Sequence, residues 1–231
     1  MKRKRVLVVD VGGSNVKLMI SSRVKRRKFP SGRGLTPRRF ITETKKAVTD
    51  WKFDAVAIGF PAPVKNGKIA AEPKNLGRGW TRFDFRRAFG KPVRVMNDAA
   101  MQALGSYRGR RMLFLGLGTG LGSALLWDNT VLSLELSDLR YTDNQTLEAK
   151  LGDAGLKKLG EERWQTEVLQ VLPALKKAFI ADYIVLGGGN AKCIEKLPAN
   201  VELGHNRNAY RGGARRWETI PGSRQPRWNI I

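Results

Sequence analysis

An aspartate followed by a pair of glycines comes directly after an apolar run near the start of the chain. The run Val6-Leu7-Val8-Val9 predicts a strand, and the segment from Asp10 to Lys17 (DVGGSNVK) predicts a tight turn after it. Two glycines let a backbone approach an anion closely, while a serine hydroxyl and an asparagine amide can donate hydrogen bonds to it. The carboxylate can hold Mg²⁺ through water. The segment therefore suits phosphate binding, with an ordinary hairpin turn as the alternative.

Three further segments with chemical potential follow in order. Gly116 to Gly122 (GLGTGLG) and Gly187 to Lys192 (GGGNAK) each follow an apolar run, and Asn97-Asp98 ends the short run from Val93 to Met96. We expect the first two glycine turns to be hairpins with amides facing phosphate, and the third to lead into a helix whose N-terminus favours anions. No Gly-Lys-Ser/Thr follows these turns, and no acidic residue lies at the distance typical of dinucleotide-binding folds.

The elements that must position these residues repeat in two similar halves. The first half is expected to hold strands at 6–9, 16–21 and 25–29, a helix at 37–51, a strand at 55–60, a helix at 83–89, a strand at 93–96 and a helix at 99–107. The second is expected to hold strands at 112–117, 122–127 and 130–136, helices at 147–151, 153–159 and 166–179, and a strand at 183–186. The pattern predicts lobes at 1–109 and 110–231 with the cleft between them, and a loose tail after Ala214. The long proline-containing loop after residue 60 is expected to form a substrate lid or wall.

On these motifs the chain resembles the sugar kinases of the actin-like ATPase superfamily, and within them the ROK family, in particular its polyphosphate glucokinases. The resemblance runs from Val6 to about Ala214 and covers the phosphate motifs at 10–17 and 116–122, the substrate-loop segments at 59–64 and 75–80, Asn97-Asp98, the helix pair at 147–164 and the adenosine-side motif at 187–189. It implies an α/β, two-lobe, actin-like ATPase (ribonuclease H-like) fold, with a mixed sheet and helices in each lobe.

The resemblance also implies a reaction, namely phosphoryl transfer to the 6-hydroxyl of glucose or a related hexose. Asp98 would be the general base, and Asp10 would support Mg²⁺ through water. The implied sugar-binding residues are Asn75, Asn97, Glu135 and Asp138. The implied phosphate-binding residues are Asp10, Gly12, Gly13, Ser14, Asn15, Lys17, Gly118, Thr119, Gly120, Gly187, Gly188, Gly189 and Lys192. For Asp98 the structural alternative is an N-cap, because Asn-Asp before two alanines is good capping chemistry.

Two departures from the family pattern are visible. Most ROK proteins carry a zinc-binding cysteine cluster with a histidine, whereas this chain has only Cys193 and His205, so we expect no structural zinc. At the segment from Glu135 to Asp138 the family pattern is Glu-x-Gly-His, and here Ser137 and Asp138 replace the glycine and the histidine. An ionised aspartate accepts hydrogen bonds but donates none. The sugar and its preferred anomer are therefore open.

The charge of the chain is strongly positive, with 43 Lys and Arg against 20 Asp and Glu and a formal net charge of +23. Such an excess attracts polyanions. The basic residues concentrate in Arg23, Lys25, Arg26, Arg27, Lys28, Arg33, Arg38 and Arg39, and in the tail at Arg207, Arg211, Arg215, Arg216, Arg224 and Arg227. A solvated basic surface and a polyphosphate-binding groove are the two main explanations, and the candidate groove segments are 26–28 and the cluster at 211, 215 and 216. Nucleic acid is not the expected partner, because no helix-turn-helix, zinc-finger or aromatic RNA-binding signature is visible.

Several alternatives stay open for donor, partner and location. Polyphosphate is the favoured donor, ATP is the second, and rival hypotheses are an ATP-only sugar kinase and a catalytically silent sugar- or polyanion-binding relative. A ROK-type regulator would need a DNA-binding domain, for which we expect no room ahead of the strand at Val6. No run of about 18 apolar residues predicts a membrane span, and the basic start lacks signal-peptide character, so we expect a cytoplasmic protein. A homodimer and a monomer are both open.

Overall fold

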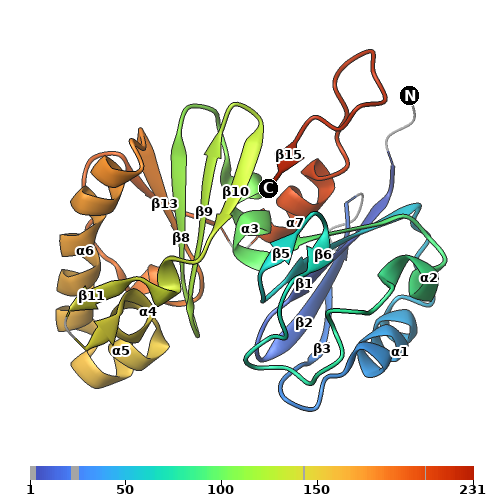
Figure 1. Ribbon diagram of the computed structural model, residues 1–231, viewed down its shortest axis with the longest axis horizontal. Helices are drawn as coiled ribbons and strands as arrows, with labels where there is room; N and C mark the ends of the chain where they lie inside the picture. The colour runs from blue at the N-terminus through green and yellow to red at the C-terminus, as the bar shows by residue number, and fades with distance from the viewer. Residues whose placement is uncertain (1–3, 22–25, 143, 206) are drawn as a thin grey trace.

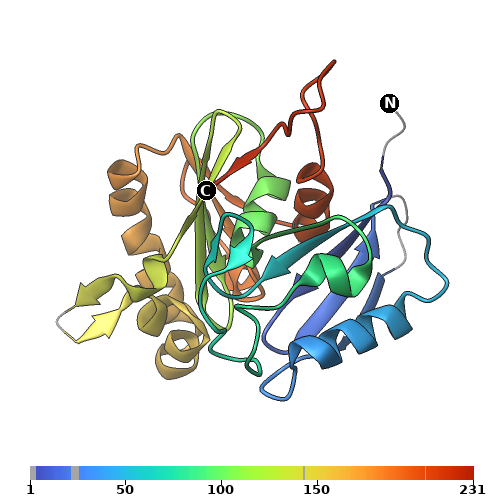
Figure 2. The same ribbon diagram turned by 45° about the vertical axis from the view of Figure 1, so that its right-hand side comes forward.

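The chain folds into two lobes, each built on its own β-sheet, with helices α3 and α7 in the middle of the molecule (Figures 1 and 2). The computed structural model describes residues 4–21, 26–142, 144–205 and 207–231. Part of the basic segment named above, from Arg23 to Lys25, lies outside the described residues, as does the expected start of the third strand at Lys25. The predicted two-lobe α/β architecture is confirmed.

The first sheet has five strands in the order β3-β2-β1-β4-β7. Its strands are β1 (Val6–Val11), β2 (Asn15–Ile20), β3 (Arg26–Pro30), β4 (Ala55–Phe60) and β7 (Val93–Asn97). Strands β1, β2 and β3 form the predicted antiparallel meander, and β1, β4 and β7 are mutually parallel. The carboxyl ends of these three parallel strands therefore share one edge of the sheet, where the first glycine turn and Asn97-Asp98 lie.

The second sheet repeats this topology and adds one strand, in the order β14-β13-β8-β9-β10-β15. Its strands are β8 (Met112–Leu117), β9 (Leu121–Trp127), β10 (Thr130–Leu134), β13 (Tyr183–Gly187), β14 (Val201–Leu203) and β15 (Asn229–Ile230). Strands β8, β9 and β10 again form an antiparallel meander, and β13 and β14 continue in parallel from β8. Both glycine-rich hairpin turns are thus at the ends of equivalent strands in the two halves.

Helices and short connecting elements complete the two lobes. The helices are α1 (Pro37–Ala47), α2 (Phe85–Phe89), α3 (Asp98–Ser106), α4 (Leu147–Leu151), α5 (Asp153–Leu159), α6 (Glu161–Ala178) and α7 (Asn208–Arg215), with 3₁₀ turns η1 (Leu136–Asp138) and η2 (Asn190–Cys193). Two small hairpins are β5 (Val64–Lys65) with β6 (Lys68–Ile69), and β11 (Arg140–Thr142) with β12 (Gln145–Thr146). Among the described residues, no helix has both the length and the apolar character required to cross a membrane.

Local sequence explains most of these elements. All six residues of β1 are buried, as expected for a central strand covered on both faces. Strand β2 instead places Val16, Leu18 and Ile20 in the core of the first lobe. Helix α1 begins as predicted, with Thr36 accepting a hydrogen bond from the Arg39 amide and Pro37 in the first turn.

The two central helices pack against each other at unusually short range. A Cβ at Gly212 of α7 would overlap the carbonyl oxygen of Met101 in α3, and a Cβ at Gly105 of α3 would overlap the carbonyl oxygen of Asn208. Gly213 faces the side chain of Val8, so α7 also covers one face of the first sheet. The division of the chain near Gly109 remains a prediction, and α7 is an element beyond it that packs on the first lobe.

Three of the differences between the structure and the sequence prediction concern the tail and the ends of two helices. The tail after Ala214 is not loose, because β15 pairs with β10 and Trp228 is only 5% exposed. Helix α6 begins at Glu161 rather than at 166, since two glutamates in its first turn favour helix initiation where no apolar periodicity is visible. Helix α1 ends at Ala47 rather than at Trp51. Trp51 lies beyond the helix and packs in the core of the first lobe.

Candidate active site

The two candidate carboxylates lie at the edge where β1, β4 and β7 end. Asp10 pairs in register with Gly59 of β4, and Gly59 pairs with Met96 of β7. A Cβ at Gly59 would stand 3.3 Å from the Cα of Asp98, so Asp98 lies directly beside this central strand. The structure therefore brings together the predicted metal-supporting carboxylate and the predicted base.

Burial raises the pKa of Asp98 to about 7, and the negative charge of Asp10 is the next largest cause. Glu135 adds a smaller effect in the same direction, while a hydrogen bond from the Ala99 amide to Oδ1, at 2.9 Å, opposes the shift. A carboxylate with a pKa near neutrality is well matched to accept a proton from a hydroxyl at physiological pH.

The N-cap of α3 is Asn97 and not Asp98. Oδ1 of Asn97 accepts a hydrogen bond from the Ala100 amide at 3.1 Å, and Nδ2 donates to the carbonyl oxygen of Ala62 at 3.4 Å. Asp98 is the first residue within the helix. The capping role that was the alternative for Asp98 thus belongs to Asn97. Asn97 positions the start of α3 and with it the carboxylate of Asp98.

Asp10 is almost fully buried, and its nearest cation is the ammonium group of Lys17 on β2. The Nζ of Lys17 lies 3.8 Å from Oδ2 of Asp10. Burial raises the pKa of Asp10, and Lys17 opposes this rise.

The first glycine turn uses some of its backbone groups to hold its own shape. The Gly12 amide donates to the carbonyl oxygen of Asn15 at 3.0 Å, and the Ser31 hydroxyl donates to the carbonyl oxygen of Gly12 at 2.6 Å. Asn75, from the long loop, lies against Gly13, where a glycine Cβ would be 3.9 Å from Asn75 Cβ. Both backbone groups of Gly12 are thus engaged within the turn, whereas Ser14 is exposed, and the phosphate-binding role of Gly12 stays a prediction.

The second glycine turn is held by helices α4 and α5. The Gly118 amide donates to the carbonyl oxygen of Gly120 at 3.1 Å, and the Asp153 amide donates to the carbonyl oxygen of Gly118 at 2.9 Å. The carboxylate of Glu148 accepts a hydrogen bond from the Leu121 amide at 3.0 Å. The Gly118 amide is thus engaged within the turn, and Thr119 and Gly120 are the better candidates for phosphate contact.

The third glycine turn lies next to the second, because Gly187 pairs in register with Gly116. Gly188 has a φ of +83°, and a Cβ there would overlap backbone atoms of Leu117. The turn leads into η2, a 3₁₀ turn of four residues, and not into the predicted α-helix. The helix N-terminus that was expected to favour an anion at this turn is therefore not formed. Lys192 is exposed within η2.

A second group of charges gathers around Glu135 on the other side of the site. Partial burial raises the pKa of Glu135, Asp138 and Glu148 add to the rise, and Lys74 opposes it. Nζ of Lys74 lies 3.5 Å from Oδ1 of Asp138, which joins the long loop of the first lobe to η1 of the second. Sequence reasoning missed Lys74 and Glu148 as site residues, because only the fold brings them near Glu135. The signals for Glu148 were its place in the helix pair at 147–164, which resembles that of the polyphosphate glucokinases, and in the first turn of α4.

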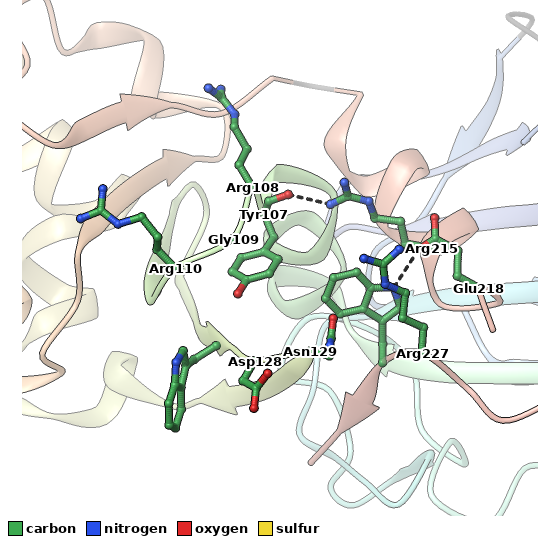
Figure 3. A pocket seen from close by; sticks show the side chains of 11 residues that line it. Tyr107, Arg108, Gly109, Arg110, Asp128, Asn129, Arg215, Glu218 and Arg227 are labelled. Atoms are coloured by element: carbon green, nitrogen blue, oxygen red, sulfur yellow. Dashed lines mark hydrogen bonds and ion pairs between the residues drawn. The ribbon is translucent and has the colours of Figure 1, made fainter. Parts of the chain in front are cut away.

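A hollow of the described surface lies elsewhere, at the opposite end of α3 from Asp98 (Figure 3). It has a volume of about 580 Å³ and is lined by Tyr107, Arg108, Arg110, Trp127, Arg215 and Trp228, among others. Arg215 donates hydrogen bonds to the carbonyl oxygens of Leu104 and Tyr107 at 2.7 and 2.8 Å. Arg215 therefore caps the last turn of α3 and does not reach the carboxylates.

Replacement of Glu148 by alanine is expected to loosen the second glycine turn. The Leu121 amide would lose its acceptor, which costs about 1 to 3 kcal/mol for a buried donor. We expect a lower free energy of unfolding in urea, whereas Glu148→Gln, which keeps an acceptor oxygen, should lose much less. Equal stability of Glu148→Ala and the parent protein would contradict the assigned role.

Comparison with known proteins identifies the family of the chain. The profile of the ROK family matches residues 6–133, which is more than half of the chain. The polyphosphate glucokinase of Mycobacterium tuberculosis (strain ATCC 25177 / H37Ra) is 24% identical over 211 residues, which cover 81% of this chain and 78% of that protein.

Two solved structures share the fold. The inorganic polyphosphate/ATP-glucomannokinase of Arthrobacter sp. strain KM superposes with a TM-score of 0.78 at 21% identity, covering 91% of this chain and 97% of that one. A ROK family glucokinase of Streptomyces griseus, solved with glucose and AMPPNP, superposes with a TM-score of 0.73 at 16% identity, covering 91% and 98%. The fold is thus the actin-like ATPase fold of these kinases, as the sequence predicted, and the chain belongs to the ROK family.

Proposed function

We propose that the protein is a sugar kinase that transfers a phosphoryl group from polyphosphate or ATP to the 6-hydroxyl of glucose or a related hexose. The observation that carries this proposal is the carboxylate of Asp98, whose pKa is about 7, beside Asp10 and in the same electrostatic environment as Glu135. A base poised near neutrality, next to a second carboxylate and a glycine turn, suits proton removal from a hydroxyl during phosphoryl transfer.

The remaining residues of the site divide into two roles. Asn75, Asn97, Glu135 and Asp138 would bind sugar hydroxyls, and Asn97 retains one N–H for this purpose beyond its bond to Ala62. The two hairpin turns and the third turn would surround the donor phosphates. The hydroxyl oxygen would bond to phosphorus as the bond to the leaving phosphate oxygen breaks, and the proton would pass to Asp98.

The residues around Asp10 fit a magnesium ion. Mg²⁺ in kinases is bound through one or two carboxylates, water and the substrate's phosphates, and a buried carboxylate at the end of β1 offers such a ligand. Asp10 would hold the ion through water, and the bound ion would offset the negative charge of the phosphates. The described part of the chain contains no group of three His, Cys, Asp or Glu residues that could hold a metal ion, so water and the substrate's phosphates would supply the remaining ligands.

The donor is proposed from the names of the relatives. One is called a polyphosphate glucokinase and another a polyphosphate/ATP-glucomannokinase, which supports both donors and two related hexoses. Purified protein assayed with glucose or mannose, Mg²⁺ and either ATP or polyphosphate, with the hexose 6-phosphate detected by coupled oxidation, tests the proposal. Turnover with ATP alone would make it an ATP-only sugar kinase, and sugar binding without turnover would make it a silent relative.

Restoring the family pattern at η1 is expected to strengthen glucose binding. The double variant Ser137→Gly with Asp138→His replaces an acceptor that is paired with Lys74 by a side chain that can donate to a hydroxyl. We expect a Michaelis constant for glucose that is lower by about 5- to 10-fold, since one hydrogen bond contributes about 1 kcal/mol. Asp138→Asn is the control that removes only the charge. An unchanged constant in the double variant would show that η1 does not contact the sugar.

A further inference from the structure

Two lysines and the buried Asp10 form a row across the first sheet. Asp10 of β1 is directly opposite Lys17 of β2, and Lys17 is directly opposite Lys28 of β3, the edge strand. Residues directly opposite each other on neighbouring strands point to the same face of a sheet, about 5 Å apart. The row therefore begins at Asp10 in the candidate active site and runs outward to the edge strand of the sheet.

This row is an unfavourable arrangement for the sheet by itself. Like charges directly opposite each other on paired strands destabilise the pair. Lys17 is partly compensated by Asp10 at 3.8 Å and is 54% exposed. Lys28 is exposed, and none of the salt bridges found among the described residues includes it. An anion lying along the row would remove the repulsion between the two ammonium groups.

The neighbours of Lys28 on β3 divide between the face of the sheet that carries Asp10 and the opposite face. Arg26 lies on the same face as Lys28, and its guanidinium is 5.9 Å from the ring centre of Tyr210 on α7. Arg27 lies on the opposite face, where it pairs with Asp50, donates to the carbonyl oxygen of Ala47 and stacks on Trp51. Of the basic segment 26–28, only Arg26 and Lys28 thus share a face with Asp10.

We propose that Lys17, Lys28 and Arg26 form a track that binds the distal phosphates of a linear polyphosphate donor while its terminal phosphoryl group lies at Asp10. This inference rests on the proposed kinase function and specifies its donor. A row of cations that continues away from the reacting end suits a polymer with one charge on each unit. The triphosphate of a nucleotide ends after three units and has no phosphate to place at the sheet edge.

Kinetics with donors of different length test the track. The variant Lys28→Gln is compared with the parent protein and with Lys177→Gln, which removes an equally exposed lysine from α6 of the other lobe. The donors are long-chain polyphosphate, tripolyphosphate and ATP, each at several salt concentrations. We expect Lys28→Gln to raise the Michaelis constant for the long chain by about 3- to 10-fold and to lower its salt slope by about one, as for a lost phosphate contact. The constants for ATP and tripolyphosphate should not change, and Lys177→Gln should resemble the parent.

Equilibrium binding of long-chain polyphosphate, measured by calorimetry on the same three proteins, separates the track from the reaction. If no donor supports turnover, the proposed function fails, and a weaker affinity of Lys28→Gln for the polymer would still support the track. Equal effects of Lys28→Gln on all donors, or none on the polymer, would overturn it. Aggregation of Lys28→Gln with unchanged polymer affinity would mean that Lys28 protects the edge strand from pairing with other chains. This result would also overturn the proposed track.

Discussion

Asp98→Asn is expected to lower the turnover of sugar phosphorylation by roughly 10² to 10⁴ while sugar and donor still bind. The amide keeps the shape of the side chain and an acceptor for the Ala99 amide, so the start of α3 should persist. It cannot accept the hydroxyl proton. Initial rates give the loss of turnover, and calorimetry gives the sugar affinity. A variant that keeps more than about a tenth of the parent turnover would show that Asp98 is not the base.

The pH dependence provides a second readout of the same residue. Because the pKa of Asp98 is about 7, the carboxylate is protonated below this value and cannot act as a base. We expect kcat/KM of the parent protein to rise with pH and to level off above about 7, and the residual activity of Asp98→Asn to lack this step. A profile that levels off near pH 4 would mean that another group limits the reaction.

The same pKa predicts a stability effect of opposite sign to the activity effect. An aspartate ionises near pH 4 in the unfolded chain, so between about 4 and 7 the folded state binds the additional proton and loses stability as pH rises. Asn cannot ionise. We therefore expect Asp98→Asn to be more stable than the parent at pH 8, on the order of 1 kcal/mol or more, with the difference disappearing near pH 4. Urea unfolding at both pH values measures it.

Gly212→Ala is expected to be strongly destabilising for so small a substitution. The new methyl group would overlap the carbonyl oxygen of Met101, and because this obstacle is backbone, α3 and α7 would have to separate. Overpacking of this kind costs about 3 kcal/mol. Gly189→Ala is the matched control, because its φ of −68° suits alanine and no atom lies within 4 Å of the new methyl group. Unfolding free energies in urea that agree within about 0.5 kcal/mol for the two variants would contradict the close packing.

Sequence patterns predicted the longer strands well because their apolar runs are local, whereas the short strands β5, β6, β11, β12, β14 and β15 were not predicted. The bounds of β4 and β8 match the prediction at both ends, and both glycine hairpins are in the predicted places. The tail, α7 and the 3₁₀ turn η2 could not be predicted in this way, since their structure depends on contacts with residues far away in sequence. The same holds for Lys74, which approaches Asp138 only where the two lobes meet, and for Glu148, which comes near Glu135 only through the folding of the second lobe.

The basic segments of the sequence did not by themselves show which positive side chains are available to a ligand. Arg26, Arg27 and Lys28 are adjacent in sequence, yet the alternation of a strand sends Arg27 to the face that carries Asp50 and Trp51. Arg215, one of the tail arginines, binds carbonyl oxygens at the end of α3. A count of positive residues predicts attraction to polyanions, but only the pairing of strands and helices shows which cations are available to a ligand.

The packing of α7 on Val8 has a consequence for synthesis of the chain. Strand β1 is translated before the second sheet, whereas α7, the helix that covers one of its faces, is translated after every strand of that sheet except β15. The first lobe therefore cannot complete its folding as an independent unit while the chain grows. During that interval the face of β1 that carries Val8 lacks the helix that covers it in the folded protein.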